Sequence, residues 1–221
     1  MGHTFVTQAA DGHSLSVYMA GPADATKGIV LVQEIFGVNH HIRDMADRFA
    51  ALGYAVVAPA LFERVEHGVE LGYTAEDVAK GRDYRMKLSD AEVMADIEAA
   101  AALLSGKKLG IVGYCFGGTV AWWGSTRSTS FSAASCWYGG GIAGTKNESM
   151  NCPVQMHFGE KDASIPMTDV DAIRAAQPKA DAHVYLGAQH GFGCDERGSY
   201  SKSDYDLAQS RTIEFFAKHL G

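Results

Sequence analysis

A cysteine surrounded by glycines carries the clearest chemical signal in this sequence. The segment 113–118 (GYCFGG) follows an apolar run and precedes a stretch that can begin a helix. This order matches the G-x-nucleophile-x-G turn, which holds its nucleophile in a strained conformation and needs glycine where chains approach closely. A helix N-terminus also favours the thiolate form of cysteine. We predict that Cys115 is a nucleophile; the alternative is a small buried cysteine in a glycine-rich turn.

Two further residues follow Cys115 in the order that such a nucleophile requires. The acid comes next along the chain and the histidine last. Asp162 follows the apolar run 153–158, and His190 follows the apolar run 182–186. We therefore predict a triad of Cys115, Asp162 and His190. The alternatives are a surface aspartate in a turn and a structural loop histidine.

Glu34 is a second carboxylate in an unusual position, because it ends an apolar strand and opens the segment 34–37 (EIFG). A buried carboxylate costs free energy unless it has a partner. We predict a functional role for Glu34, and the alternative is a purely structural role. The amide of Phe116, directly after the nucleophile, is the expected first donor to an oxyanion.

Short apolar runs alternate with amphipathic ones along the whole chain. Strands without polar alternation, separated by helices, predict an α/β fold whose mostly parallel central sheet carries helices on both faces. Residues 61–87 are highly charged, and we expect a solvated loop there that contributes substrate contacts. The expected strands are 28–33, 54–59, 108–113, 131–138, 153–158 and 182–186, and the expected helices are 40–52, 90–104, 117–123, 167–176 and 205–220.

Length and charge limit the classes of protein to which the chain can belong. Its 221 residues suit a single domain, residues 1–221. The net charge of -7 without a basic run argues against nucleic-acid binding. The sequence shows neither a secretory signal nor an apolar stretch of membrane-spanning length, so we expect a cytoplasmic protein without membrane contact. The four cysteines lack metal-ligand spacing and are expected to be thiols, with Cys136 and Cys152 in packing roles.

Several separated motifs together resemble the dienelactone hydrolase family, also called carboxymethylenebutenolidases, within the α/β-hydrolase fold. The resemblance implies the Cys115, His190, Asp162 triad, oxyanion amides from Ile35 and Phe116, and a Glu34 that contacts the thiol and assists its activation. It also implies attack of the thiolate on a lactone carbonyl, an enolate leaving group, release of the acyl-enzyme by water, and neither a metal nor an organic cofactor. The motifs are 33–39 (QEIFGVN), 54–59, 113–118, Tyr138-Gly139, 159–162 (GEKD) and 190–192 (HGF).

The residues that would hold a substrate carboxylate depart from the family pattern. Family members use two arginines, one of them four residues after the catalytic histidine, where this chain has Cys194; the nearest downstream arginine is Arg197. On the other side Lys80, Arg82 and Arg85 lie near the expected place. The candidate substrate contacts are Phe36, Arg82, Tyr84, Arg85, Tyr138 and Arg197, with pocket and core roles open for Phe36 and Tyr138 and a core role expected for Trp122 and Trp123.

The sequence thus predicts a cysteine-dependent hydrolase that opens a lactone or cleaves a small ester through a thioacyl-enzyme. Its expected partner is a small-molecule lactone or ester, and we expect a monomer. One alternative is a general carboxylesterase or thioesterase of the same fold without carboxylate selectivity. The other is a binding protein that keeps the fold without turnover.

Overall fold

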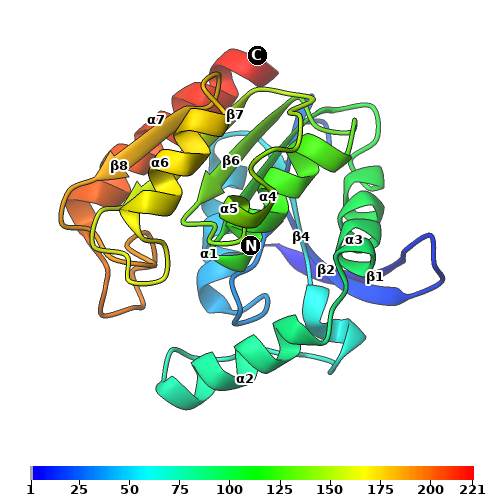
Figure 1. Ribbon diagram of the computed structural model, residues 1–221. Helices are drawn as coiled ribbons and strands as arrows, with labels where there is room; N and C mark the ends of the chain where they lie inside the picture. The colour runs from blue at the N-terminus through cyan, green and yellow to red at the C-terminus, as the bar shows by residue number, and fades with distance from the viewer. Residues whose placement is uncertain (1) are drawn as a thin grey trace. The chain divides into compact units, whose positions relative to one another are not determined.

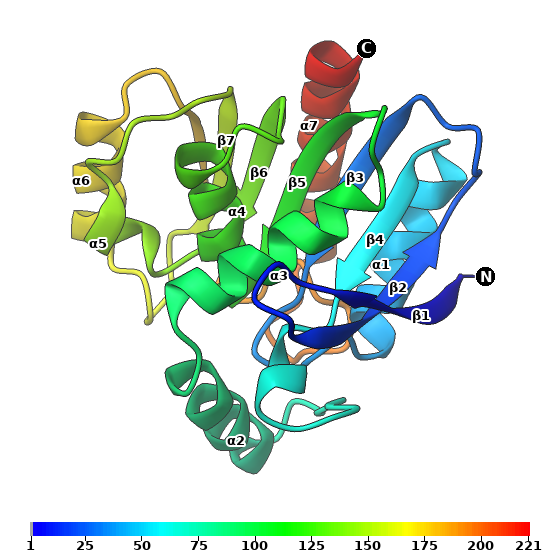
Figure 2. The ribbon, with the colours of Figure 1, turned by 90° about the vertical axis from the view of Figure 1, so that its right-hand side faces the viewer.

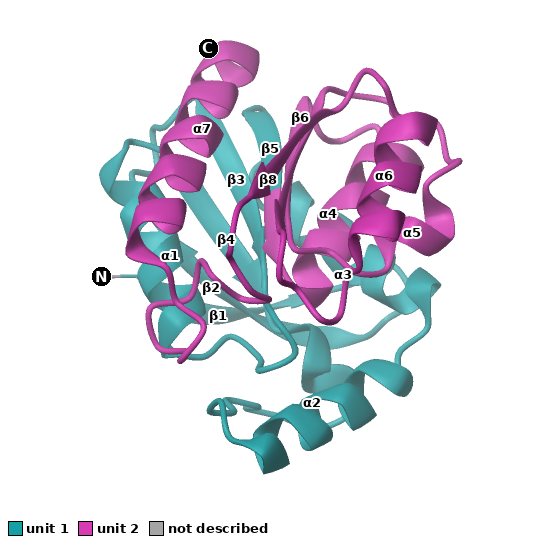
Figure 3. Ribbon diagram, turned by 60° about the vertical axis from the view of Figure 1, so that its left-hand side comes forward, with its two compact units in different colours: residues 1–111 teal, residues 112–221 magenta. Residues whose placement is uncertain are grey.

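The computed structural model describes residues 2–221, and the chain divides into two compact units, Met1–Ile111 and Val112–Gly221 (Figure 3). The boundary falls inside the strand β5 (Lys108–Tyr114). Each unit combines strands with helices. The expectation of a single domain stays a prediction.

Unit 1 contains strands with both orientations. Antiparallel pairs join β1 to β2 and β2 to β4, and a parallel pair joins β3 to β4. The helices α1 and α3 both pack on β4, and Figure 2 shows them on opposite faces of it. The elements are β1 (His3–Gln8), β2 (Ser14–Ala20), β3 (Lys27–Val32), α1 (His40–Ala51), β4 (Ala55–Pro59), the 3-10 helix η1 (Leu61–Arg64), α2 (Ala75–Met86) and α3 (Asp90–Ala102).

Unit 2 contains only parallel strand pairs beyond β5, namely β6 with β7 and β7 with β8. Helix α7 packs on β6 and β7, while α4 packs on β6 from the other side (Figures 1 and 3). The strands β6 and β7 are buried along their whole length, as expected for a sheet covered on both faces. The elements are α4 (Phe116–Arg127), β6 (Ala133–Trp137), α5 (Ile142–Thr145), β7 (Val154–Gly159), α6 (Met167–Ala176), β8 (Asp181–Tyr185) and α7 (Lys202–Leu220).

The predicted strands and helices are all present, with ends shifted by a few residues. The expected loop at 61–87 is wrong in part, because the segment contains η1 and the helix α2. A capping box begins α2: the Thr74 side chain accepts from the Asp77 amide while the Asp77 carboxylate accepts from the Thr74 amide. Its buried residues are only Gly81 and Tyr84, so its apolar pattern is too weak to reveal it.

The sequence did not predict β1, β2 or α5. Strand β1 has no buried residue, and only its pairing with β2 defines it. Helix α5 has four residues, which is too short for a periodic pattern. Among the helices of residues 2–221, none has the length and the apolar character that crossing a membrane requires.

Candidate active site

Cys115 occupies the sharp turn between β5 and α4. It has φ 54° and ψ -113°, a conformation that costs a residue with a side chain free energy and is characteristic of functional turns. The turn is held by two backbone hydrogen bonds: the Cys115 amide donates to the Trp137 carbonyl (3.0 Å), and the Gly118 amide donates to the Cys115 carbonyl (3.0 Å). The thiol therefore stands at the N-terminus of a helix, as the sequence predicted.

Two of the glycines around Cys115 are required by close approach of the backbone. A Cβ atom at Gly113 would lie 2.0 Å from the Gly117 carbonyl oxygen, and one at Gly118 would lie 2.3 Å from the Trp137 carbonyl oxygen. Both distances are far below a van der Waals contact, and the obstacles are backbone atoms that cannot rotate away. The sequence did not predict that the Trp137 carbonyl, at the end of β6, is the group that approaches Gly118. The glycines 139–141, which follow β6, do indicate that two backbone segments approach closely there.

The three residues of the predicted triad lie in one hydrogen-bonded chain within unit 2. His190 Nε2 lies 3.1 Å from Cys115 Sγ, and His190 Nδ1 lies 2.7 Å from Asp162 Oδ2. The Asp162 side chain is fully buried, and its Oδ1 accepts a hydrogen bond from the Ser164 amide (2.8 Å). Asp162 is therefore fixed, and it fixes the imidazole with one nitrogen directed at the sulfur.

Cys115 and Asp162 together raise the pKa of His190. Burial disfavours the imidazolium, but a Cys115 thiolate and the hydrogen bond to Asp162 favour it more strongly, and the pKa of His190 rises to about 10. An imidazolium between two anionic groups is the arrangement that stabilises a thiolate at neutral pH. The site thus holds a protonated imidazole nitrogen 3.1 Å from the Cys115 sulfur at neutral pH.

We expect kcat/KM for ester hydrolysis to fall above a pH of about 10, where His190 loses its proton. Because this pKa is raised above that of an unfolded histidine, the stability contributed by the triad is complete below about pH 6.5. It is lost as pH rises toward about 10. NMR titration of the His190 ring tests the cause: in Cys115→Ser the midpoint should fall, since the thiolate is gone. An unchanged midpoint would contradict a thiolate-imidazolium pair.

Tyr138 lies against His190 and is fully buried. Its ring meets the His190 ring edge to face, with 5.2 Å between centroids. Its φ of 39° is unusual for a residue with a side chain, and its amide donates to the His157 carbonyl (2.8 Å). Both pocket and core were open for Tyr138; the structure places it in the core, beside His190.

Arg197 packs against the loop that carries His190. A Cβ atom at Gly191 would lie 2.4 to 2.8 Å from atoms of the Arg197 guanidinium group, so the guanidinium covers the residue next to His190. A glycine at 191 makes room for this contact, and its φ of +74° also favours glycine. The structure therefore brings one of the candidate carboxylate ligands close to the triad loop.

The segment after β3 is buried and firmly held within unit 1. Glu34 is 1% exposed, and the Gln33 side chain donates to the Glu34 carbonyl (3.3 Å) and accepts from the Leu61 amide (3.1 Å). Helix α2 packs on the same segment, since a Cβ atom at Gly81 would lie 2.0 Å from the Ile35 carbonyl oxygen. The roles predicted for Glu34 and Ile35 stay predictions.

The other candidate substrate contacts in unit 1 differ in their exposure to solvent and in the contacts that their side chains make. Tyr84 donates to the Glu66 carboxylate, and Arg85 donates to the Leu88 carbonyl (2.8 Å) and the Asp90 carboxylate (3.1 Å). Arg82 is exposed. Phe36 is buried and meets Tyr73 edge to face. Their contacts with substrate stay predictions.

Trp122, Trp123 and two of the other three cysteines lie in the core of unit 2, and Cys152 is the exception. Trp122 and Trp123 are buried, as predicted. Cys136 is fully buried and Cys152 is half-buried. Among the described residues of either unit taken alone, no three His, Cys, Asp or Glu side chains converge closely enough to hold a metal ion.

Comparison with known proteins decides the family. A family model described as "Dienelactone hydrolase family" matches residues 15–220. The chain belongs to the dienelactone hydrolase family. It is 35% identical over 239 residues to the "Putative carboxymethylenebutenolidase" of Synechocystis sp., covering 98% of this chain and 97% of that protein. It is 30% identical to the protein of the same name from Escherichia coli (strain K12), covering 98% of this chain and 87% of that protein.

Solved structures agree with this membership. The crystal structure titled "Putative Dienelactone Hydrolase" from Klebsiella pneumoniae is 30% identical, has a TM-score of 0.80, and each chain is covered to 99%. A dienelactone hydrolase-like promiscuous phosphotriesterase from metagenomic libraries, 21% identical, has a TM-score of 0.78 over 100% of this chain and 99% of that chain, and shows the fold alone. The predicted α/β-hydrolase fold is confirmed, and this dienelactone hydrolase family member is a hydrolase of lactone or ester bonds.

Proposed function

We propose that this hydrolase uses Cys115 as its nucleophile and passes through a thioacyl-enzyme. One observation carries the proposal: the Cys115 sulfur, at a strained helix N-terminus, lies 3.1 Å from an imidazole nitrogen whose ring is held by a buried aspartate. Position at the helix N-terminus and the neighbouring imidazolium both favour the thiolate. These are the conditions under which a thiol attacks an ester carbonyl at neutral pH.

The first half of the reaction forms the thioester. The thiolate of Cys115 attacks the carbonyl carbon, and the Phe116 amide at the start of α4 donates to the developing oxyanion. The Ile35 amide is the proposed second donor, and the buried Glu34 carboxylate is proposed to assist activation of the thiol. When the C–O bond breaks, His190 Nε2 gives its proton to the leaving oxygen. A lactone stays attached through its acyl part, and an ester releases an alcohol.

The second half restores the enzyme. The now neutral His190 removes a proton from water, and the hydroxide oxygen bonds to the thioester carbon. The C–S bond then breaks, so that the thiolate and the imidazolium are both regenerated and the acid product leaves. Asp162 stays ionised throughout, because its part is to hold the ring and stabilise its positive form.

We further propose a substrate that carries its own carboxylate, held in part by Arg197. The support is the position of the Arg197 guanidinium on Gly191, the neighbour of His190. The names of the Synechocystis and Escherichia coli relatives refer to such a lactone, a carboxymethylenebutenolide. The competing function is a general esterase or thioesterase that has no preference for a charged substrate.

Comparison of a carboxymethylenebutenolide with its neutral primary amide separates these functions. A charge-assisted contact is worth about 1.5–3 kcal/mol, so kcat/KM should be roughly 10- to 100-fold higher for the acid. In Arg197→Met this ratio should collapse toward one, whereas Arg82→Met, which changes an exposed arginine, is the matched comparison. Equal kcat/KM for both substrates in the wild type would refute carboxylate selectivity and favour the general esterase. If the ratio fell toward one in Arg82→Met but not in Arg197→Met, Arg82 would be the residue that contacts the substrate carboxylate.

A further inference from the structure

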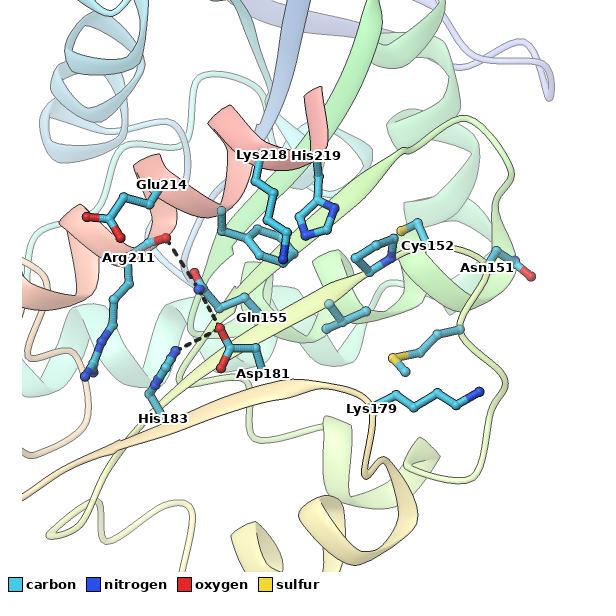
Figure 4. Close-up of a pocket in the computed structure, with 14 residues that line it drawn as sticks. Asn151, Cys152, Gln155, Lys179, Asp181, His183, Arg211, Glu214, Lys218 and His219 are labelled. Atoms are coloured by element: carbon cyan, nitrogen blue, oxygen red, sulfur yellow. Dashed lines mark hydrogen bonds and ion pairs between the residues drawn. The ribbon is translucent and has the colours of Figure 1, made fainter. Parts of the chain in front are cut away.

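A cavity in unit 2 includes no residue of the triad. Its volume is about 810 Å³, which is within the range of small-molecule sites. It is formed by the segment 150–155 with the start of β7, by the start of β8, and by the C-terminal part of α7 (Figure 4). The cavity therefore has the size of a binding site and stands apart from the catalytic residues.

One wall of the cavity is apolar. Pro153 and Val154 line it from the start of β7, and Phe215 lines it from α7. The Phe215 ring packs against the His219 ring, with 4.6 Å between centroids and 57° between the ring planes, so two tilted rings meet at this wall. Such a surface suits an aromatic or other flat apolar group, which gains free energy on leaving water.

Positive charge in the lining of the cavity comes from two lysines that make no ion pair. Lys179 and Lys218 both line the cavity, and neither makes an ion pair within the described part of the chain. Figure 4 shows the Lys218 side chain reaching from α7 into the middle of the lining residues. In a chain of net charge -7, this is a place where positive charge is locally uncompensated.

The acidic residues of the lining do not cancel these lysines. The Asp181 carboxylate accepts from Gln155 Nε2 (3.1 Å) and lies 3.1 Å from His183 Nε2. Glu214 accepts from the Ser210 hydroxyl (3.2 Å), and Figure 4 shows its carboxylate directed away from Lys218. One acid is thus engaged in the floor of the cavity and the other is turned aside.

The floor is rigid because it is part of a buried hydrogen-bond network. The Gln155 amide donates to Asp181 and to the Arg211 carbonyl, and the Gln155 oxygen accepts from the Thr212 hydroxyl (3.3 Å). His157 Nε2 lies 3.0 Å from the same Gln155 oxygen. Because these side chains are already held in place, little conformational entropy is lost at the floor when a ligand binds.

We propose that this cavity binds a small organic acid that joins an aromatic or similarly flat apolar body to one carboxylate. The apolar body lies on Pro153 and Phe215, and the carboxylate pairs with the Lys218 amine, with Lys179 adding to the local potential. A single charge fits better than a phosphate dianion. Lys218 is in the last turn of α7, where the helix dipole opposes added negative charge, and a strong phosphate site would need backbone amides as well.

Binding of 2-naphthoate and of the neutral 2-naphthamide to the full chain tests this proposal. Titration calorimetry would give the affinity, and NMR of the histidine rings would give the site. We expect 2-naphthoate to bind and to shift the ring signals of His219 and His183 while leaving those of His190 unchanged. We expect 2-naphthamide to bind roughly 10-fold more weakly or not at all, because it lacks the charge.

The matched variants are Lys218→Met and Lys202→Met. Both lysines are on α7, but Lys202 pairs with Asp206 (2.6 Å) and does not line the cavity. Lys218→Met should weaken 2-naphthoate binding roughly 10-fold or more, and Lys202→Met should leave it unchanged. Equal affinity for acid and amide, equal effects of the two variants, shifts confined to His190, or the absence of binding at millimolar concentration would each overturn the proposal.

Discussion

Replacement of Cys115 by alanine should reduce kcat/KM for ester hydrolysis by at least roughly 10⁴-fold, with the fold unchanged. The sulfur is the atom that lies 3.1 Å from His190 Nε2, and it is the atom proposed to form the covalent intermediate. Removing it leaves only the oxyanion donor and substrate binding, which provide a small residual rate. The measurement is steady-state hydrolysis of an activated ester, with thermal unfolding as the check on folding.

Cys152→Ala is the matched control for this loss. Cys152 is also partly accessible, but burial raises its pKa to about 11, so it stays a neutral thiol at pH 7 and is a poor nucleophile. Its replacement should leave kcat/KM within roughly two-fold of the wild type, since most mutations away from a site act only through stability. Mass spectrometry of the wild type quenched during turnover should find the acyl group on Cys115. Hydrolysis that survives Cys115→Ala would sink the proposed mechanism.

Asp162→Asn should lower kcat by roughly 10²- to 10⁴-fold at pH 7. Asp162 Oδ2 accepts from His190 Nδ1 at 2.7 Å, and this bond sets which imidazole nitrogen is directed at the sulfur. An asparagine has nearly the same shape and can keep the hydrogen bond from the Ser164 amide, so the loop should survive. Its NH₂ group can donate to Nδ1, however, which favours the wrong tautomer and removes the charge that supports the imidazolium.

Two measurements distinguish this effect from a loss of structure. The pKa of the His190 ring should fall in Asp162→Asn, because an attractive charge has been removed, and thermal unfolding should show that the variant is folded. Asp171→Asn, which changes an exposed aspartate of α6, is the control and should keep the wild-type kcat. If Asp162→Asn kept full activity with an unchanged His190 pKa, Asp162 would not be the acid of the site.

The local parts of the site could be predicted because each depends on neighbouring residues. An apolar run, two glycines and a helix start identify the turn at Cys115, since the turn requires those residue types within a few positions. Strands β6 and β7 and helix α1 were equally predictable, because burial imposes a continuous apolar run on a covered strand and a 3.6-residue period on a helix. Helix α2 was not predicted, because few of its residues are buried and burial therefore imposes little apolar pattern on it.

What the sequence determined by itself is therefore the set of local elements, the order of nucleophile, acid and histidine, and the chemistry that these side chains can perform. Only the tertiary structure decided that His190 meets Cys115, 75 positions away, and Asp162, 28 positions away. It also decided that Tyr138 packs on His190 and that Arg197 lies on Gly191. Contacts between distant residues depend on how strands pair and loops pack, and no local preference encodes those distances.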